Sequence, residues 1–137
     1  IQIMLHVLDL YSSSEDKTVK IWNLKTLSYE REYKFSSLVN TIHLHPNQAD
    51  LVCGTEDGKI SIIDLAKDKI VYSHTLPSSV RSVNCSFDGT KCVACTNKGI
   101  VYLFSFQKTK DDSLELKLEN SFKAHNTNIL KVNLQII

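Results

Sequence analysis

Residues 15–24 read Glu-Asp-Lys-Thr-Val-Lys-Ile-Trp-Asn-Leu, and the pattern of this stretch recurs twice further along the chain. The recurrence has a constant interval of 41 residues in two series of positions: Asp16, Asp57 and Lys98 at a polar turn, and Trp22, Ile63 and Phe104 in the apolar run that follows it. A polar turn followed by a short apolar run predicts a β-hairpin in each copy. The fixed interval therefore predicts a repeat protein built from similar β-sheet units.

A period of about 40 to 45 residues, with an acidic turn and a strand that ends in Trp-Asn or Asp-Leu, resembles the WD repeat. Each WD repeat is one four-stranded blade of a β-propeller. We therefore expect an all-β fold, a partial WD-repeat propeller of about three four-stranded antiparallel blades. The expected units are residues 1–35, 36–76 and 77–122, with the first strand of a further blade in 123–137.

Length and composition limit the alternatives. A chain of 137 residues holds little more than three such units, whereas closed propellers carry roughly 4 to 8 blades, so we expect a piece of a longer polypeptide. Sixteen basic and fifteen acidic residues give a net charge of +1, which does not favour binding to nucleic acid. No stretch approaches the ~18 consecutive apolar residues of a membrane helix, and we expect a cytoplasmic protein without a transmembrane segment.

A metal site deserves consideration, because Cys92 and Cys95 form a C-x-x-C pair and His43 and His45 also occur. The repeat places all four cysteines, Cys53 included, at interior strand positions, where cysteine acts as a small apolar residue. In a strand, Cys92 and Cys95 point to opposite faces. We therefore expect reduced buried thiols, a partly exposed histidine pair, and neither a metal nor a cofactor.

Catalysis is not indicated by any motif. The sequence has no G-x-S-x-G elbow and no H-E-x-x-H helix, and its four glycines leave little material for a phosphate-binding loop. A hydrolytic or metal-dependent enzyme on a propeller scaffold is the alternative from a different class, and we expect a protein that is not an enzyme.

By resemblance to WD repeats, a hydroxyl eight residues before the Trp position joins a hydrogen-bonded set with the turn aspartate, the indole and a histidine. The positions that match this structural set are Ser14, Asp16, Trp22, Thr55, Asp57, Thr96 and His125. These residues are expected to satisfy buried polar groups rather than to catalyse a reaction.

Turns at the ends of blades can present side chains to a protein partner while the sheets hold them in place. The candidate protein-binding residues are Glu15, Asp16, Glu56, Asp57, Asn97 and Lys98.

Finer features narrow the resemblance. Several segments and a polar insertion before Leu114 resemble the small WD-repeat subunits of the TOR (target of rapamycin) kinase complexes. The segments are 38–51, 80–83, 88–90, 97–99, 101–102, 123–126 and 129–131. That family implies a non-catalytic subunit with a seven-bladed propeller, which docks on the kinase catalytic domain and stabilises it, with other TOR-complex subunits as partners. The alternative is a WD-repeat adaptor of another pathway, such as a ubiquitin-ligase substrate receptor.

An incomplete ring leaves sheet faces and edges open, which invites pairing. We therefore expect the isolated chain to self-associate, with residues 129–134 completing a blade of another copy or of itself.

Overall fold

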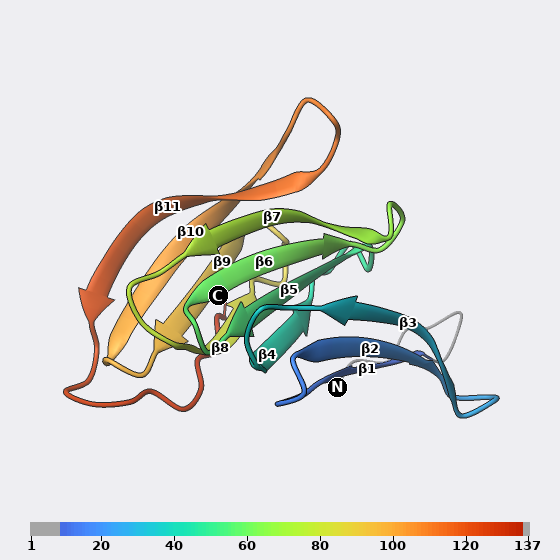
Figure 1. Ribbon diagram of the computed structural model, residues 1–137. Coiled ribbons are helices and arrows are strands. Elements are labelled where there is room, and N and C mark those ends of the chain that lie inside the picture. The colour runs from blue at the N-terminus through green and yellow to red at the C-terminus, as the bar shows by residue number, and fades with distance from the viewer. Residues whose placement is uncertain (1–8, 136–137) are drawn as a thin grey trace.

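The computed structural model describes residues 9–135, and all regular secondary structure in that range is β-strand (Figure 1). The strands are β1 (Asp9–Ser13), β2 (Thr18–Asn23), β3 (Ser28–Lys34), β4 (Val39–Leu44), β5 (Asp50–Thr55), β6 (Lys59–Asp64), β7 (Lys69–Thr75), β8 (Val80–Cys85), β9 (Lys91–Thr96), β10 (Ile100–Lys108) and β11 (Leu114–Lys123). The described residues include no helix that could span a membrane.

The strands form three antiparallel sheets, each a simple meander in chain order. The first sheet contains β1–β3, the second β4–β7 and the third β8–β11. This architecture confirms the all-β expectation and is consistent with part of a propeller. The first sheet has three strands within the described residues, and residues 1–8 of the expected first unit lie outside them.

The sheets pack face to face, and one apolar cluster fills each of the two interfaces. Tyr11, Ile21 and Leu51 belong to the cluster between the first and second sheets. Ile62 and Phe104 belong to the cluster between the second and third sheets. A sheet covered on both faces needs apolar residues at successive strand positions, which explains the pattern of β6, buried from Ile60 to Asp64.

The β2, β6 and β10 strands are equivalent, and the same backbone bond fixes the turn in front of each. The N–H groups of Phe35, Leu76 and Ala124 donate to the carbonyls of Lys17, Gly58 and Gly99, at 2.8 Å in each case. These three acceptors all have positive φ, at 71°, 93° and 79°. The linker that leaves each sheet is therefore tied to a turn of that same sheet.

Residues 129–134 were expected to form the first strand of a further blade, and the structure assigns no strand there. Ile129 N–H donates to the Thr96 carbonyl at the end of β9, at 3.2 Å. Further along, backbone groups bond to side chains of the third sheet: Val132 N–H donates to Ser82 Oγ and Leu134 N–H to Asn84 Oδ1. Val83 and Cys85 N–H donate in the same way to Thr41 and His43 of the second sheet. The segment thus lies on the third sheet as β8 lies on the second, without a ladder of its own.

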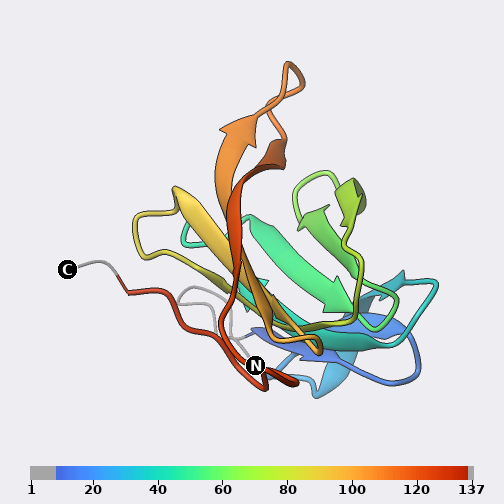
Figure 2. The ribbon, with the colours of Figure 1, turned by 90° about the vertical axis from the view of Figure 1, so that its left-hand side faces the viewer.

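The expected polar insertion forms the end of the β10–β11 hairpin, which projects beyond the sheets (Figure 2). It is anchored at its turn, where Lys67 Nζ donates to the Asp111 carbonyl at 2.6 Å and to Ser113 Oγ at 2.5 Å. The hairpin is therefore linked to the β6–β7 turn of the second sheet.

Candidate protein-interaction site

Three hairpin turns and the linkers between sheets gather at one end of the molecule. We call this end the turn end and define it by residues 14–17, 36–38, 55–58, 77–79 and 96–99. Backbone bonds hold linker to turn across sheets: Glu56 N–H donates to Leu38 carbonyl and Asn97 N–H to Ser79 carbonyl. Of the candidate binding residues, Glu15, Asp16, Asp57 and Lys98 are exposed, and Glu56 and Asn97 are half-buried.

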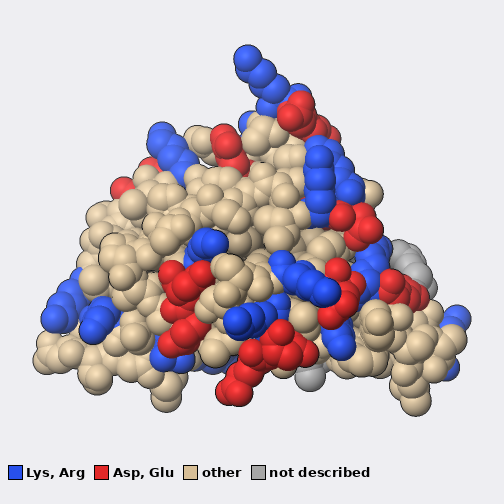
Figure 3. Space-filling view, viewed as in Figure 1, with Lys and Arg blue, Asp and Glu red and all other residues tan. Residues whose placement is uncertain are grey.

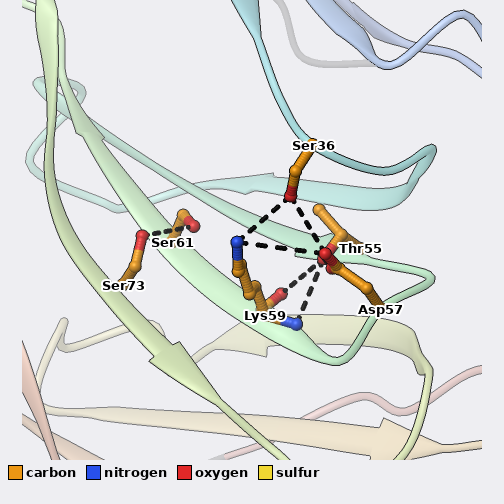
Figure 4. Close-up of polar contacts among 6 residues, drawn as sticks. All are labelled: Ser36, Thr55, Asp57, Lys59, Ser61 and Ser73. Carbon is orange, nitrogen blue, oxygen red and sulfur yellow. Dashed lines mark hydrogen bonds and ion pairs between the residues drawn. The ribbon is translucent and has the colours of Figure 1, made fainter.

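Asp57 is the centre of a polar network at this end (Figure 4). Thr55 Oγ1 donates to its Oδ1 at 2.5 Å, and Ser36 Oγ donates to its Oδ2 at 3.0 Å. Lys59 Nζ donates to Ser36 at 3.1 Å and lies 3.9 Å from Asp57 Oδ2. Burial alone would raise the pKa of Asp57, but the hydrogen bonds from Thr55 and Ser36 lower it. Asp57 therefore stays ionised and holds the turn against the linker.

Figure 4 also shows the hydroxyls of Ser61 and Ser73, which are hydrogen-bonded at 2.9 Å and join the buried β6 to the outer β7.

Glu56 forms a second network, which crosses from the second sheet to the third. Its Oε2 accepts from Asn40 Nδ2 at 2.7 Å and Ser79 Oγ at 2.9 Å, and its Oε1 accepts from Arg81 Nη2 at 3.3 Å. The amide of Asn40 also donates to the Val80 carbonyl at 2.9 Å. The bond from Asn40 lowers the pKa of Glu56. Three side chains thus donate hydrogen bonds to the Glu56 carboxylate. The carboxylate links two sheets and is not free to contact a partner.

The expected set in the first unit is partly wrong. The indole Nε1 of Trp22 donates to Ser12 Oγ at 2.8 Å, not to Ser14. The Ser14 hydroxyl instead accepts from the N–H of Asp16 at 3.1 Å. Asp16 Oδ1 accepts from both N–H and Oγ1 of Thr18, at 3.0 and 2.6 Å. Ser14 and Asp16 therefore close the turn, and Trp22 is tied to β1 separately, because Ser12 and Trp22 face the same side of paired strands.

The other units depart further from the expected set. Thr96 Oγ1 donates to the Ile100 carbonyl at 3.4 Å and accepts from the N–H of Lys98, which stands where the other turns have aspartate. His125 was expected to contribute its imidazole, but its side chain is exposed and makes no hydrogen bond with the described residues. Only its backbone N–H bonds, to the Gly99 carbonyl at 3.2 Å.

The cysteines lie where the repeat predicts, at buried strand positions. Cys92 belongs to the core between the second and third sheets, whereas Cys95 packs with Val101 and Ile129 on the opposite face, which confirms that the C-x-x-C pair is split. All four thiols are free, and among residues 9–135 no three histidine, cysteine or carboxylate side chains meet as metal ligands would.

Both histidines were expected to be partly exposed, and this is wrong for one of them. His43 is half-buried, but His45 is buried. His45 Nδ1 accepts from Asn47 N–H at 3.1 Å, so its Nε2 carries the proton and donates to Gly89 carbonyl at 2.9 Å. His45 thus joins the second sheet to the third.

Sequence reasoning missed Ser12, Asn40 and Arg81 in these polar bonds. Ser36 and Ser79 contribute from the linkers between sheets. A signal for one pair exists, because Arg81 follows Asn40 by the repeat interval of 41 residues. Contacts that cross from one repeat to the next cannot be read from the pattern inside a single repeat.

Surface charge is mixed. Figure 3 shows basic and acidic side chains interspersed over the face in view, without one large patch of either sign. The turn end has the same character, since it carries one exposed base, Lys98, and three exposed acids, Glu15, Asp16 and Asp57. Such a surface suits a protein partner with complementary charges better than a polyanion.

Comparison with known proteins identifies homologues along most of the chain. A family model described as WD domain, G-beta repeat, matches residues 6–23 and 28–64. The chain is 37% identical over 124 residues to the Target of rapamycin complex subunit LST8-1 of Arabidopsis thaliana, an alignment that covers 89% of the chain and 41% of that protein. The chain is a WD-repeat homologue of LST8 subunits.

Two further relatives carry corresponding names. The Target of rapamycin complex subunit LST8 of Saccharomyces cerevisiae is 34% identical over 125 residues, covering 90% of the chain and 41% of the relative. The mouse (Mus musculus) protein of the same name is 31% identical over 120 residues, covering 85% and 37%. The chain therefore spans about two fifths of the length of these curated relatives. These matches confirm the resemblance to the small WD-repeat subunits of TOR complexes.

Proposed function

We propose that this chain is part of a non-catalytic scaffold that binds the catalytic domain of a TOR-type kinase and stabilises it within TOR complexes. The observation that carries the proposal is homology along most of the chain to proteins named as subunits of the target of rapamycin complex. In the same proposal, the other subunits of the complex are further partners, and the protein acts in the cytoplasm.

The turn end is the surface that we assign to the kinase. Its backbone is fixed by bonds between linkers and turns, and the Asp57 network fixes one turn further. A surface that is ordered before binding loses little conformational freedom on binding, so more of the contact energy contributes to affinity. The exposed Glu15, Asp16, Asp57 and Lys98 would then supply charge complementarity.

Two exposed residues allow a test that leaves the internal networks intact. The side chains of Glu15 and Lys98 make no hydrogen bond or ion pair with the described residues. A double charge reversal, Glu15→Lys with Lys98→Glu, keeps the net charge. The control is Lys25→Glu, which reverses one exposed charge in the turn at the other end of β2, away from the turn end.

The measurement is recovery of a tagged TOR-type kinase with the native protein, its double variant and the control. The native protein and the control are expected to recover the kinase, and the double variant should recover several-fold less. Failure of the native protein to recover any TOR-type kinase would overturn the proposed function. Equal recovery by the double variant would instead remove the turn end as the contact surface.

A further inference from the structure

Cys85 at the end of β8 lies directly opposite Cys92 near the start of β9. The next pair along the ladder, Ser86 and Lys91, is joined by a backbone bond from Ser86 N–H to the Lys91 carbonyl at 2.8 Å. Antiparallel ladders alternate bonded and non-bonded pairs, so Cys85 and Cys92 form a non-hydrogen-bonded pair. Such pairs bring Cα atoms to about 4.5 Å, which lies within the ~4.4–6.8 Å that a disulfide spans.

The two side chains also share one environment. Both belong to the core between the second and third sheets. The Cys85 N–H donates to Nδ1 of His43 at 3.3 Å, which places the imidazole beside this pair. The Cys92 thiol and the His43 imidazole lower the pKa of Cys85. The neighbouring Cys85 sulfur and burial raise the pKa of Cys92. The thiolate, which is the nucleophile, therefore forms at Cys85.

The two thiols differ in burial. Cys85 is 5% exposed and Cys92 is 0% exposed. Cys85 is the last residue of β8, next to a turn whose Phe87 and Asp88 are exposed. The first oxidation step is thus expected at Cys85, with Cys92 held behind it.

We propose that Cys85 and Cys92 are a reversible redox pair, which a peroxide converts to a cross-strand disulfide between β8 and β9. The Cys85 thiolate attacks one oxygen of hydrogen peroxide, and the O–O bond breaks to give a sulfenic acid on Cys85 and hydroxide. The hydroxide takes up the proton that the Cys85 thiol released and leaves as water. Cys92 sulfur then attacks the resulting sulfenic acid, the S–O bond breaks, and a second water leaves with the Cys92 proton. Two thiols lose two electrons, and peroxide gains them. A thiol reductant reverses the bond by exchange.

The remaining cysteines are internal controls, because each faces a residue that is not cysteine. Cys53 lies opposite Ile42 on one side and Ser61 on the other. Cys95 lies opposite Ser82 and Val101, on the other face of the third sheet. Neither can form a disulfide without rearranging its sheet.

The experiment treats the native protein with hydrogen peroxide, blocks remaining thiols after unfolding, and maps tryptic peptides by mass spectrometry. Cleavage after Arg81, Lys91 and Lys98 separates Cys85 from Cys92. The expected product is a cross-linked pair of peptides 82–91 and 92–98, lost on reduction, with Cys53 blocked as in untreated protein. Because Cys95 shares a peptide with Cys92, the Cys95→Ser variant must give the same cross-link.

Two variants assign the roles. Cys92→Ser is expected to stop at a sulfenic acid on Cys85, trapped by a sulfenic-acid-specific probe, and Cys85→Ser should leave Cys92 unoxidised. The proposal is overturned if both thiols remain blockable after peroxide treatment of native protein. It is also overturned if Cys85 advances to sulfinic acid without a cross-link, or if the cross-link joins two copies on a non-reducing gel.

Discussion

The imidazole Nδ1 of His43 accepts a hydrogen bond from the backbone N–H of Cys85 at 3.3 Å, across the interface between the second and third sheets. Two residues earlier on each strand, Thr41 Oγ1 accepts from Val83 N–H at 3.2 Å. Side chains of β4 thus bond to the backbone of β8. These bonds position the sheets, in addition to the apolar packing between them.

Replacing Thr41 by valine should destabilise the chain. Valine keeps the shape but removes the acceptor, and the N–H of Val83 would then lose this bond at a buried residue. An unpaired buried donor costs roughly 1–3 kcal/mol. Urea unfolding should show this loss, whereas Thr41→Ser, which keeps the hydroxyl, should remain close to wild type. Equal stability of the valine variant would mean that another group satisfies this N–H.

Two equivalent turn positions with positive φ, Gly58 and Lys17, should respond differently to substitution. Gly58 has φ of 93°, and an added Cβ would lie 2.5 Å from the Leu76 carbonyl oxygen. Gly58→Ala should therefore cost about 1–3 kcal/mol through backbone strain. Lys17 occupies the equivalent turn position with φ of 71°, so Lys17→Gly should be neutral or stabilising by up to about 1 kcal/mol. Thermal unfolding of both variants checks the signs, and destabilisation by Lys17→Gly would contradict the argument.

Glu56 should make stability depend on acidity. The bond from Asn40 lowers its folded pKa below the ordinary 4.5, so the folded state binds this proton more weakly than the unfolded state. Its contribution is complete above the ordinary pKa and is lost as pH falls through the lowered one. Glu56→Gln should therefore lose less stability than wild type on acidification below about pH 4.5. The check is urea unfolding as a function of pH, with Glu15→Gln as an exposed control that should follow wild type.

Tyr33 should make the stability of the fold depend on pH at the alkaline end. Burial and the bond that its hydroxyl donates to Asp68 raise its pKa to about 12. A raised folded pKa gives stability that is complete below the unfolded value of about 10 and is lost as pH rises toward the folded value. Tyr33→Phe should show a shallower alkaline loss between these values than wild type. Tyr29→Phe, at an exposed ring, is the control, and equal alkaline profiles for both variants would contradict the prediction.

The 41-residue interval was sufficient to predict the strands, because turn chemistry and apolar runs are local properties of each repeat. The expected all-β fold of about three antiparallel sheets is confirmed by the sheets β1–β3, β4–β7 and β8–β11. Prediction failed where the answer depends on which residues meet across strands. Trp22 is opposite Leu10 in the ladder, so the hydroxyl within its reach belongs to Ser12 rather than to Ser14, eight residues before it.

The candidate binding residues show the same limit. Glu15 and Glu56 occupy equivalent turn positions, yet Glu15 is exposed while Glu56 is bonded to residues of two sheets. The difference depends on Asn40, Ser79 and Arg81, which come from other turns and strands. The facing of Cys85 and Cys92 likewise follows from strand register, whereas the sequence drew attention to the C-x-x-C spacing of Cys92 and Cys95.

The acceptors for the next segment have different identities in successive sheets: Thr41 and His43 in the second, Ser82 and Asn84 in the third. The Thr41 hydroxyl corresponds to the Ser82 hydroxyl, and the His43 imidazole nitrogen to the Asn84 amide oxygen. In both sheets the donors are two backbone N–H groups, two residues apart, on the next segment of the chain. The placement of each segment on the preceding sheet thus involves an acceptor side chain at two positions per repeat, in addition to the apolar packing. Hydroxyl, imidazole and amide acceptors are therefore interchangeable at these two positions without loss of the bond that each sheet makes to the segment after it.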